Sequence, residues 1–329
     1  MKKNVAVVMG GYSLEHNVSL NSGAYVMRTI DDKLYNIFKI IISKEKWVYI
    51  DGDNNEYILN KDNFTVNVDG NVTSFDLVFI IIHGDPGENG ILQKYFEELK
   101  IPFTGPNSKT AKLTFNKKKC IDFVSTHSIN AAKSFLLEKD KTYDLHKIIT
   151  KLNFPMFVKA NNSGSSFGVY KAYNEDELKK FIVDIFKIDN EIIIERFIDG
   201  REFSIGVTNF GKEIKVLAVT ELISENDFFD YEAKYEGKHK EVTPANINLD
   251  LENKLKTEAK KIYKVLKLSG FSRIDFIVEN QLPYFLEINT IPGMTEHSIF
   301  PKQVRLNNLN MTELFTEIIQ NTLKKFKFD

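Results

Sequence analysis

Short apolar runs followed by glycine-containing loops alternate with helix-like segments in the first third of the chain. Val5–Met9 and Phe75–Ile82 are the clearest of these runs. Unbroken apolar runs of this length are typical of parallel strands buried on both faces, and functional groups in such sheets gather at the strands' carboxyl ends. We therefore expect an open parallel α/β domain over residues 1–106, with candidate groups in Gly11–Glu15 and His83–Glu88. The other elements expected here are helices at Ser19–Ile30 and Ile91–Leu99 and strands at Tyr35–Ile42 and Ile101–Thr104.

The rest of the chain has a mixed pattern that predicts a two-part α+β fold, divided at residues 107–195 and 196–329. The first part is expected to contain a helix through Lys117–Lys119, strands at Met156–Lys159, Val169–Tyr173 and Glu191–Phe197, and a helix at Glu175–Lys187. The second part is expected to contain two hairpins and two helices. The hairpins are Glu202–Thr208 with Glu213–Ile223, turning at Gly211, and Phe271–Val278 with Pro283–Ile288; the helices are Leu251–Leu268 and Met311–Phe326.

Charge and cysteine content narrow the class of protein. Among 329 residues, 44 Lys and Arg oppose 45 Asp and Glu, so no global basic field is available to hold nucleic acid. The single cysteine, Cys120, excludes a disulfide framework and a cysteine-based zinc site. No apolar run reaches the ~18–20 residues that span a bilayer, and the first run is too short for a signal peptide. We expect a cytoplasmic protein without a membrane partner.

Acidic and amide side chains alternate along the last predicted hairpin. Strand periodicity places Arg273 and Asp275 on one face, and Glu287 and Asn289 on one face of the partner strand. If Asp275 pairs with Glu287, two carboxylates lie side by side, which favours a cation between them. Oxygen ligands without His or Cys favour magnesium. A surface salt-bridge lattice explains the same residues, but the following Thr290–Gly293 loop, with its backbone donors, favours a ligand site.

A loop of small residues follows the strand that ends at Lys159. The segment Asn161–Gly168 offers backbone N–H and serine hydroxyl donors suited to phosphates, although no Walker A motif occurs in the chain. Its sequence GSSFG also matches the nucleophile elbow of hydrolases, with Ser165 or Ser166 as nucleophile. An elbow is followed by a helix, whereas the next segment here has a strand pattern. A solvated hairpin turn is the simplest alternative.

Seven ordered motifs resemble those of the D-alanine–D-alanine ligases of the ATP-grasp family. They run from GGYSLEHNVS through HGDPGENG, VKANNSGSSFG, IIERFIDGRE and DYEAKY to RIDF and EINTIPGMTEHS, and so cover nearly the whole chain. Four positions depart from the family pattern. Ala160 stands in place of proline, Asn89 in place of aspartate, and the Asn116–Cys120 segment lacks the usual aspartate and second lysine.

The resemblance implies a role for each candidate residue. Lys117 and Lys159 would hold the ATP phosphates, with Ser166 above them, while Glu195, Phe197, Ile198 and Glu202 would take adenine and ribose. Asp275, Glu287 and Asn289 would bind two magnesium or manganese ions. The remaining roles concern D-alanine: Glu15, with Ser165 and Tyr235, would bind the first ammonium near His83; Arg273 and the Gly293 N–H would stabilise the oxyanion; and Lys234 and Ser298 would bind the second carboxylate.

The resemblance also implies the reaction. ATP would phosphorylate the carboxylate of one D-alanine, and the amine of a second would displace phosphate, giving the dipeptide used for peptidoglycan synthesis. A homodimer is implied in the same way. Two alternatives stay open: a sister ligase that takes D-lactate, which the lid residue Tyr235 disfavours, and a nucleotide-binding module without turnover, which the full set of candidate residues disfavours.

Overall fold

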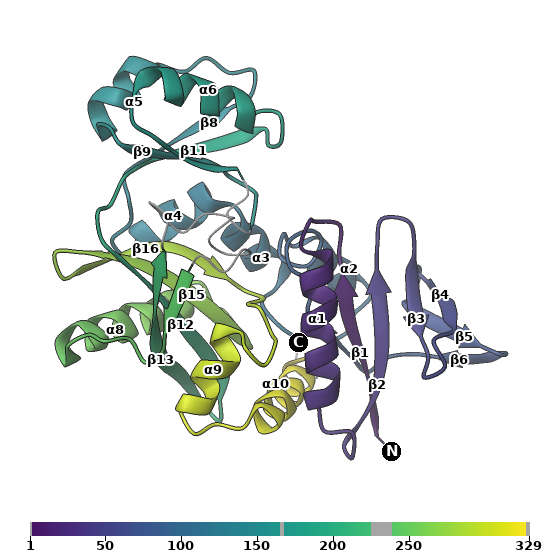
Figure 1. Cartoon of the computed structure of the whole chain (residues 1–329). Helices are drawn as coiled ribbons and strands as arrows, with labels where there is room; N and C mark the ends of the chain where they lie inside the picture. Colours follow the sequence, from purple (N-terminus) through teal and green to yellow (C-terminus); the bar gives the residue numbers. More distant parts are fainter. Residues whose placement is uncertain (1, 165–167, 225–238, 327–329) are drawn as a thin grey trace.

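Three β-sheets organise the chain (Figure 1). The computed structural model describes residues 2–164, 168–224 and 239–326. The predicted fold class, an α/β domain followed by a two-part ATP-grasp fold, is confirmed, whereas the domain boundaries at 106 and 195 stay a prediction. In the described residues, no helix is long and apolar enough to cross a bilayer.

The first sheet has the strand order β6-β5-β4-β3-β2-β1-β7. Its parallel part is β2-β1-β7, as predicted, and the buried side chains of β1 and β7 form its core. The sequence did not predict the antiparallel extension through β3–β6, and the expected strand near Phe103 is a single bridge to Val78. The bounds are β1 Lys3–Gly10, α1 His16–Thr29, β2 Tyr35–Ile42, β3 Trp47–Ile50, β4 Glu56–Asn60, β5 Thr65–Val68, β6 Asn71–Thr73, β7 Leu77–Ile80 and α2 Ile91–Glu98.

The second sheet is antiparallel, with the order β10-β9-β11-β8, and α5 and α6 pack on it. The predicted strands at β9, β10 and β11 are present; β8 and α5 were not predicted. The bounds are α3 Ser108–Phe115, α4 Lys117–Ser125, β8 Ser134–Glu138, α5 Leu145–Leu152, β9 Met156–Ala160, β10 Val169–Ala172, α6 Glu175–Ile185 and β11 Glu191–Arg196.

The third sheet has the order β14-β13-β12-β15-β16 and contains both predicted hairpins. Asn280 and Gln281 form the tight turn of the second hairpin, and both have positive φ, which suits a two-residue hairpin loop. The bounds are β12 Arg201–Phe210, β13 Glu213–Ser224, β14 His239–Val242, α8 Leu249–Val265, β15 Phe271–Glu279, β16 Leu282–Asn289, α9 Ile299–Leu306 and α10 Met311–Lys325.

The last helix connects the two ends of the chain. Phe315 and Ile318 of α10 belong to the same buried core as β7, and the Phe315 and Phe79 rings lie 5.2 Å apart. Figure 1 shows α10 between α1 and the third sheet. This packing fixes the first sheet against the third, so that the loops after β1 and β7 face the carboxyl end of β16.

Candidate active site

The carboxylate hairpin has the register on which the predicted cation site depends. Asp275 on β15 pairs with Glu287 on β16, and Arg273 pairs with Asn289. Asp275 is 2 % exposed and accepts two bonds from the Arg273 guanidinium (3.1 and 2.9 Å), one from Ser204 Oγ (2.6 Å) and one from Asn289 Nδ2 (3.0 Å). Both oxygens of this buried carboxylate are therefore fixed.

Carboxylates outnumber cations around this hairpin. Burial, and then the charges of Asp275 and Glu287, raise the pKa of Glu202 to about 8. Burial alone would lower the pKa of Lys117, but the Glu287 carboxylate at 3.0 Å more than compensates and raises it. Among the described residues no three His, Cys, Asp or Glu side chains form a metal site by themselves. A cation between Asp275 and Glu287 would therefore need Asn289 and oxygens from a bound molecule.

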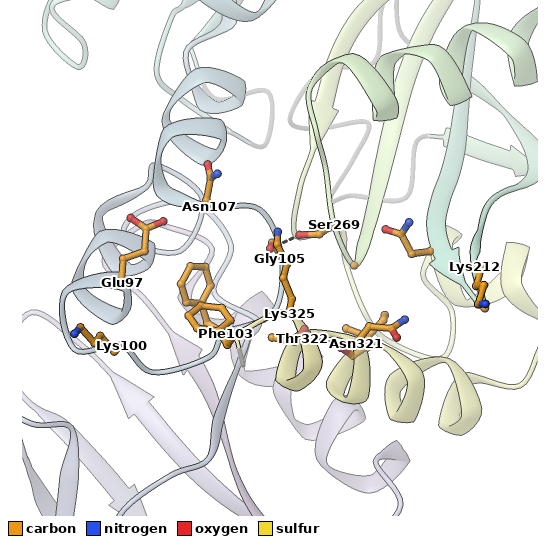
Figure 2. Close-up of a pocket in the computed structure, with 15 residues that line it drawn as sticks. Glu97, Lys100, Phe103, Gly105, Asn107, Lys212, Ser269, Asn321, Thr322 and Lys325 are labelled. Carbon is orange, nitrogen blue, oxygen red and sulfur yellow. Dashed lines mark hydrogen bonds between the residues drawn. The ribbon is translucent and has the colours of Figure 1, made fainter. Parts of the chain in front are cut away.

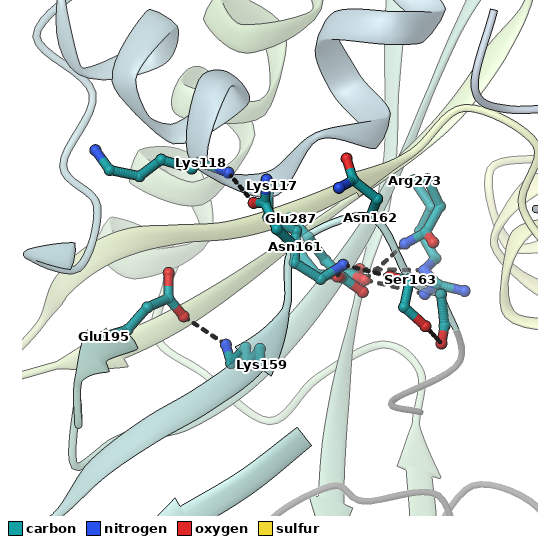
Figure 3. Close-up of polar contacts among 12 residues, drawn as sticks. Lys117, Lys118, Lys159, Asn161, Asn162, Ser163, Glu195, Arg273 and Glu287 are labelled. Atoms are coloured by element: carbon teal, nitrogen blue, oxygen red, sulfur yellow. Dashed lines mark hydrogen bonds and ion pairs between the residues drawn. The ribbon is translucent and has the colours of Figure 1, made fainter. Parts of the chain in front are cut away.

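Lys117 joins the second and third sheets at this point. It is the first residue of α4, and its Nζ donates to Ser163 O (2.8 Å) as well as to Glu287 Oε2. Figure 3 shows Lys117, Ser163 and Glu287 together, with Arg273 at the right of the view. A surface hollow here is lined by Lys117, Ser163, Gly164, Glu287 and Asn289, and also by Glu88 and Cys120. The predicted phosphate residue Lys117 and the predicted metal residues Glu287 and Asn289 are thus brought together.

Glu191, a residue that the sequence analysis missed, fixes this loop to α4. Its Oε2 accepts from the amides of Asn116 (2.9 Å), Asn161 (2.6 Å) and Asn162 (3.1 Å). Burial by itself raises the pKa of Glu191. The three hydrogen bonds together lower it by more than burial raises it, so the net shift of the pKa is downward. Asn116 also caps α4 by accepting from Lys119 N–H (3.0 Å). The departure from aspartate at position 116 is therefore matched to a carboxylate neighbour.

Lys159 and Glu195 form a closed ion pair on neighbouring strands of the second sheet. Their Nζ–Oε2 distance is 2.6 Å, and their side chains are 10 % and 5 % exposed. They line a narrow apolar slot with Phe157, Ile198 and Leu286. Phe197 lies beside it, its ring 5.9 Å from that of Phe157. The predicted phosphate lysine and the predicted adenine residues thus share one slot.

The loops of the first sheet meet this site from the other side. Glu15 lies at the start of α1, and a Cβ built on Gly84 or Gly164 would come within 3.3 or 3.0 Å of its Oε2. The loop that contains Gly164 and the loop after β7 therefore both lie directly against the Glu15 carboxylate. Burial, and then the charge of Glu15, raise the pKa of Glu88 to about 7. The sequence analysis placed candidate groups in the His83–Glu88 loop but gave Glu88 no role of its own.

His83 is 4 % exposed and contacts protein groups through both ring nitrogens. Nδ1 lies 2.8 Å from Ile291 O, and Nε2 lies 2.9 Å from Ser22 Oγ. Ser298 is the N-cap of α9, and its Oγ accepts from Thr295 N–H (3.0 Å); a Cβ built on Gly293 would lie 3.4 Å from that oxygen. Of the predicted substrate residues, Gly293 and Ser298 thus belong to the loop after β16, and His83 contacts it. Ser165, Ser166, Lys234 and Tyr235 lie outside the described residues.

Neither the hydrolase alternative nor the larger cavity of the molecule indicates a different active site. The segment after the GSSFG loop is strand β10, not the helix that a nucleophile elbow needs. A larger cavity of about 680 Å³ lies between α10, Gly105 and the β12–β13 turn (Figure 2). None of the candidate residues lines it, so its volume does not locate the chemistry.

Comparisons with known proteins show the family of the chain. The family described as "D-ala D-ala ligase N-terminus" matches residues 4–106, and "D-ala D-ala ligase C-terminus" matches residues 123–320. A D-alanine–D-alanine ligase of Flavobacterium johnsoniae is 46 % identical over 98 % of this chain and 99 % of its own, and one of Parabacteroides distasonis is 38 % identical over 99 % of both.

Solved structures show the same similarity over the whole fold. The VanG D-Ala:D-Ser ligase of Enterococcus faecalis has a TM-score of 0.88 at 30 % identity, covering 98 % of this chain and 100 % of its own. D-alanyl-alanine synthetase A of Vibrio cholerae has a TM-score of 0.88 at 27 % identity, covering 98 % of both. The chain belongs to the D-alanine–D-alanine ligase family.

Proposed function

We propose that this chain uses ATP to join two D-alanine molecules through an acyl phosphate, releasing ADP and phosphate, in peptidoglycan precursor synthesis. The observation that carries the proposal is the pairing of Asp275 with Glu287 opposite Lys117 and the phosphate loop. This places surplus negative charge beside cationic and backbone donors, an arrangement suited to a polyphosphate with its cation. The ligases named above, with which the chain aligns end to end, support the same reaction.

The donor set fits magnesium or manganese. Asp275, Glu287 and Asn289 would hold two ions, because they supply hard oxygen ligands and leave positions for phosphate oxygens. Such ions neutralise charge on the transferring phosphoryl group. Burial, and then the charges of Asp275 and Glu287, raise the pKa of Glu202, and bound ions would balance those two charges.

The chain's own residues would bind and orient both substrates. Lys117 and Lys159 already lie at the site, and each would exchange a carboxylate partner for ATP phosphates. The slot formed by Glu195, Phe197 and Ile198 would bind the adenine of ATP. Glu202 would bind the ribose, and Ser166 would lie over the phosphates.

D-alanine would bind at the junction with the first sheet. Glu15 would bind the first ammonium beside His83, with Ser165 and Tyr235. Arg273 and the Gly293 N–H would stabilise the oxyanion, since preorganised donors act where negative charge develops. Lys234 and Ser298 would bind the second carboxylate.

One assay separates this proposal from its alternatives. We expect phosphate release from Mg-ATP only when D-alanine is present, with D-alanyl-D-alanine identified by mass spectrometry. L-alanine is the matched control. Phosphate release that is independent of D-alanine, or ATP binding without turnover, would contradict the proposal.

A second candidate reaction concerns the acceptor. The likeness to a D-Ala:D-Ser ligase favours testing D-serine as the second substrate. With D-alanine held constant, we expect the D-alanine dipeptide to exceed the D-serine and D-lactate products. Dominance of either mixed product would assign the chain to a sister specificity.

We also propose that the enzyme is cytoplasmic and homodimeric. Support for the first is its composition, because a single cysteine suits a reducing compartment. Support for the second is membership of the family. Light scattering of the purified chain should give twice the 37.9 kDa chain mass; a monomer mass would refute the dimer.

A further inference from the structure

Both polar backbone groups of Ile291 are held by side chains of one remote loop. The Ile291 N–H donates to Glu88 Oε1 (3.1 Å), and the Ile291 carbonyl contacts His83 Nδ1 (2.8 Å). Glu88 Oε2 accepts from Gly84 N–H (2.9 Å), so each carboxylate oxygen has one donor. The loop after β7 therefore holds the loop after β16 across more than 200 residues of sequence.

Ser22 on α1 extends these contacts to Met294. Ser22 is fully buried, and its Oγ accepts from Met294 N–H (3.2 Å) and lies 2.9 Å from His83 Nε2. Since the Ile291 carbonyl only accepts, Nδ1 carries the imidazole proton, and Ser22 donates to Nε2. The tautomer and the hydroxyl orientation are assigned from this network.

Gly293 lies between these two fixed positions. In the part of the chain that the structure describes, the Gly293 N–H donates to no protein acceptor. It is free to donate to a bound molecule, and its direction depends on the peptides at Ile291 and Met294. Oxyanion donors are effective only when held in place, and a misplacement of ~1 Å costs about 100-fold in rate.

We propose that Glu88, His83 and Ser22 form a positioning clamp that fixes the Gly293 N–H for catalysis. The inference rests on the proposed ligase function and adds Glu88 and Ser22 to the residues on which it depends. Neither residue contacts the reacting atoms in this account; both act through the main chain of residues 291–294.

Glu88→Gln and Ser22→Ala test the clamp. Glutamine keeps the shape of Glu88 but accepts on only one of its two terminal atoms, so one N–H loses its partner. We expect kcat to fall by about 10- to 100-fold, while the dissociation constant for a nonhydrolysable ATP analogue changes by less than about 2-fold. The double variant should lose less than the product of the two single effects, because both act on one loop.

Glu97→Gln is the matched control. The Glu97 carboxylate also accepts a main-chain N–H, from Ser108 (2.8 Å), but it lies in the distant cavity of Figure 2. Its kcat should stay within about 2-fold of wild type. Amide hydrogen exchange gives a second readout that needs no turnover: residues 291 and 294 should exchange at least about 10-fold faster in the clamp variants.

Two results would overturn the clamp. One is an unchanged kcat together with unchanged amide hydrogen exchange in Glu88→Gln. This variant keeps the test decisive even if Ser22→Ala does not fold. The other is loss of analogue binding in proportion to kcat, which indicates general disruption. Absence of D-alanine-dependent turnover in the wild type refutes the proposed function instead, while the exchange result still tests the contacts.

Discussion

The second and third sheets face the same site but balance their charges differently. In the second sheet, Lys159 closes on Glu195, and three asparagine amides surround Glu191. In the third sheet, Arg273, whose side chain is 16 % exposed, lies among three carboxylates, those of Glu202, Asp275 and Glu287. One half is thus internally satisfied and the other has surplus negative charge. The difference shows which half should recruit cations.

The two candidate phosphate lysines give the largest expected contrast. Lys159→Met leaves Glu195 buried without its partner, which costs about 3–5 kcal/mol of unfolding free energy. Lys117→Met leaves Glu287, which is 37 % exposed, so the cost should be below about 1 kcal/mol. Urea denaturation without nucleotide measures both. Lys159→Met/Glu195→Leu should recover most of the loss; equal effects of the two lysines would remove the contrast.

The surplus on the third sheet should make stability depend on pH. The pKa of Glu202 is raised to about 8 in the folded state, so its contribution is fully present below about pH 4.5 and is lost as pH rises through 8. In EDTA, Glu202→Gln should be more stable than wild type at pH 8, on the order of 2 kcal/mol, and equal to it near pH 4.5.

Mg-ATP sharpens that test. Bound cations should reduce the difference between Glu202→Gln and wild type at pH 8, because they neutralise the same charge. The pKa of Glu88 is also raised, so Glu88 makes stability depend on pH as well. Its contribution is similar in Glu202→Gln and in wild type and therefore cancels in the difference between them. A difference that is independent of pH would indicate a packing effect instead.

The amide network should respond to a single restored charge. Asn116→Asp gives the family's usual residue but places a carboxylate beside Glu191 Oε2, where the Asn116 amide now lies at 2.9 Å. We expect a loss of about 1 kcal/mol at pH 8 that shrinks toward pH 4.5, and a KM for ATP raised several-fold with kcat nearly unchanged. Asn116→Asp combined with Glu191→Gln should restore stability; an inert Asn116→Asp would leave the network without a role.

Asn89→Asp, the other departure from the family pattern, should have the smallest effect. Asn89 Nδ2 donates to Asp85 Oδ1 (2.6 Å), and both residues are partly exposed. The new repulsion is therefore screened, with a cost below about 0.5 kcal/mol. A thermal melt compared with Asn89→Ser measures it, and a shift as large as that of Asn116→Asp would reverse this ranking.

Sequence periodicity predicted the elements of the fold correctly where the hydrophobic pattern was strong. Strict apolar runs located β1 and β7, and the strand pattern located β15 and β16, whereas the pairing of Asp275 with Glu287 was only a condition that the structure fulfils. The strands β3–β6 were missed because each has only three to five residues. β3 is wholly apolar, whereas Ile58 of β4 and Val72 of β6 are exposed, so the four strands share no common pattern. Strands this short give little periodic signal.

The site was predictable in its chemistry but not in its pairings. The residue types around Asp275 predicted a cation site, yet nothing local shows that Lys117 meets Glu287 or that Lys159 meets Glu195. Contacts such as His83 with Ile291 depend on how the last helix fixes the first sheet against the third. These long-range contacts follow from tertiary packing, which single-sequence patterns do not contain.

Anomalous diffraction from crystals grown with Mn²⁺ and a nonhydrolysable ATP analogue tests the central claim most directly. We predict manganese peaks between the side chains of Asp275, Glu287 and Asn289, with Lys117 turned from Glu287 toward the phosphates. A bound nucleotide with no metal at these three side chains, or with metal held elsewhere, would contradict the account.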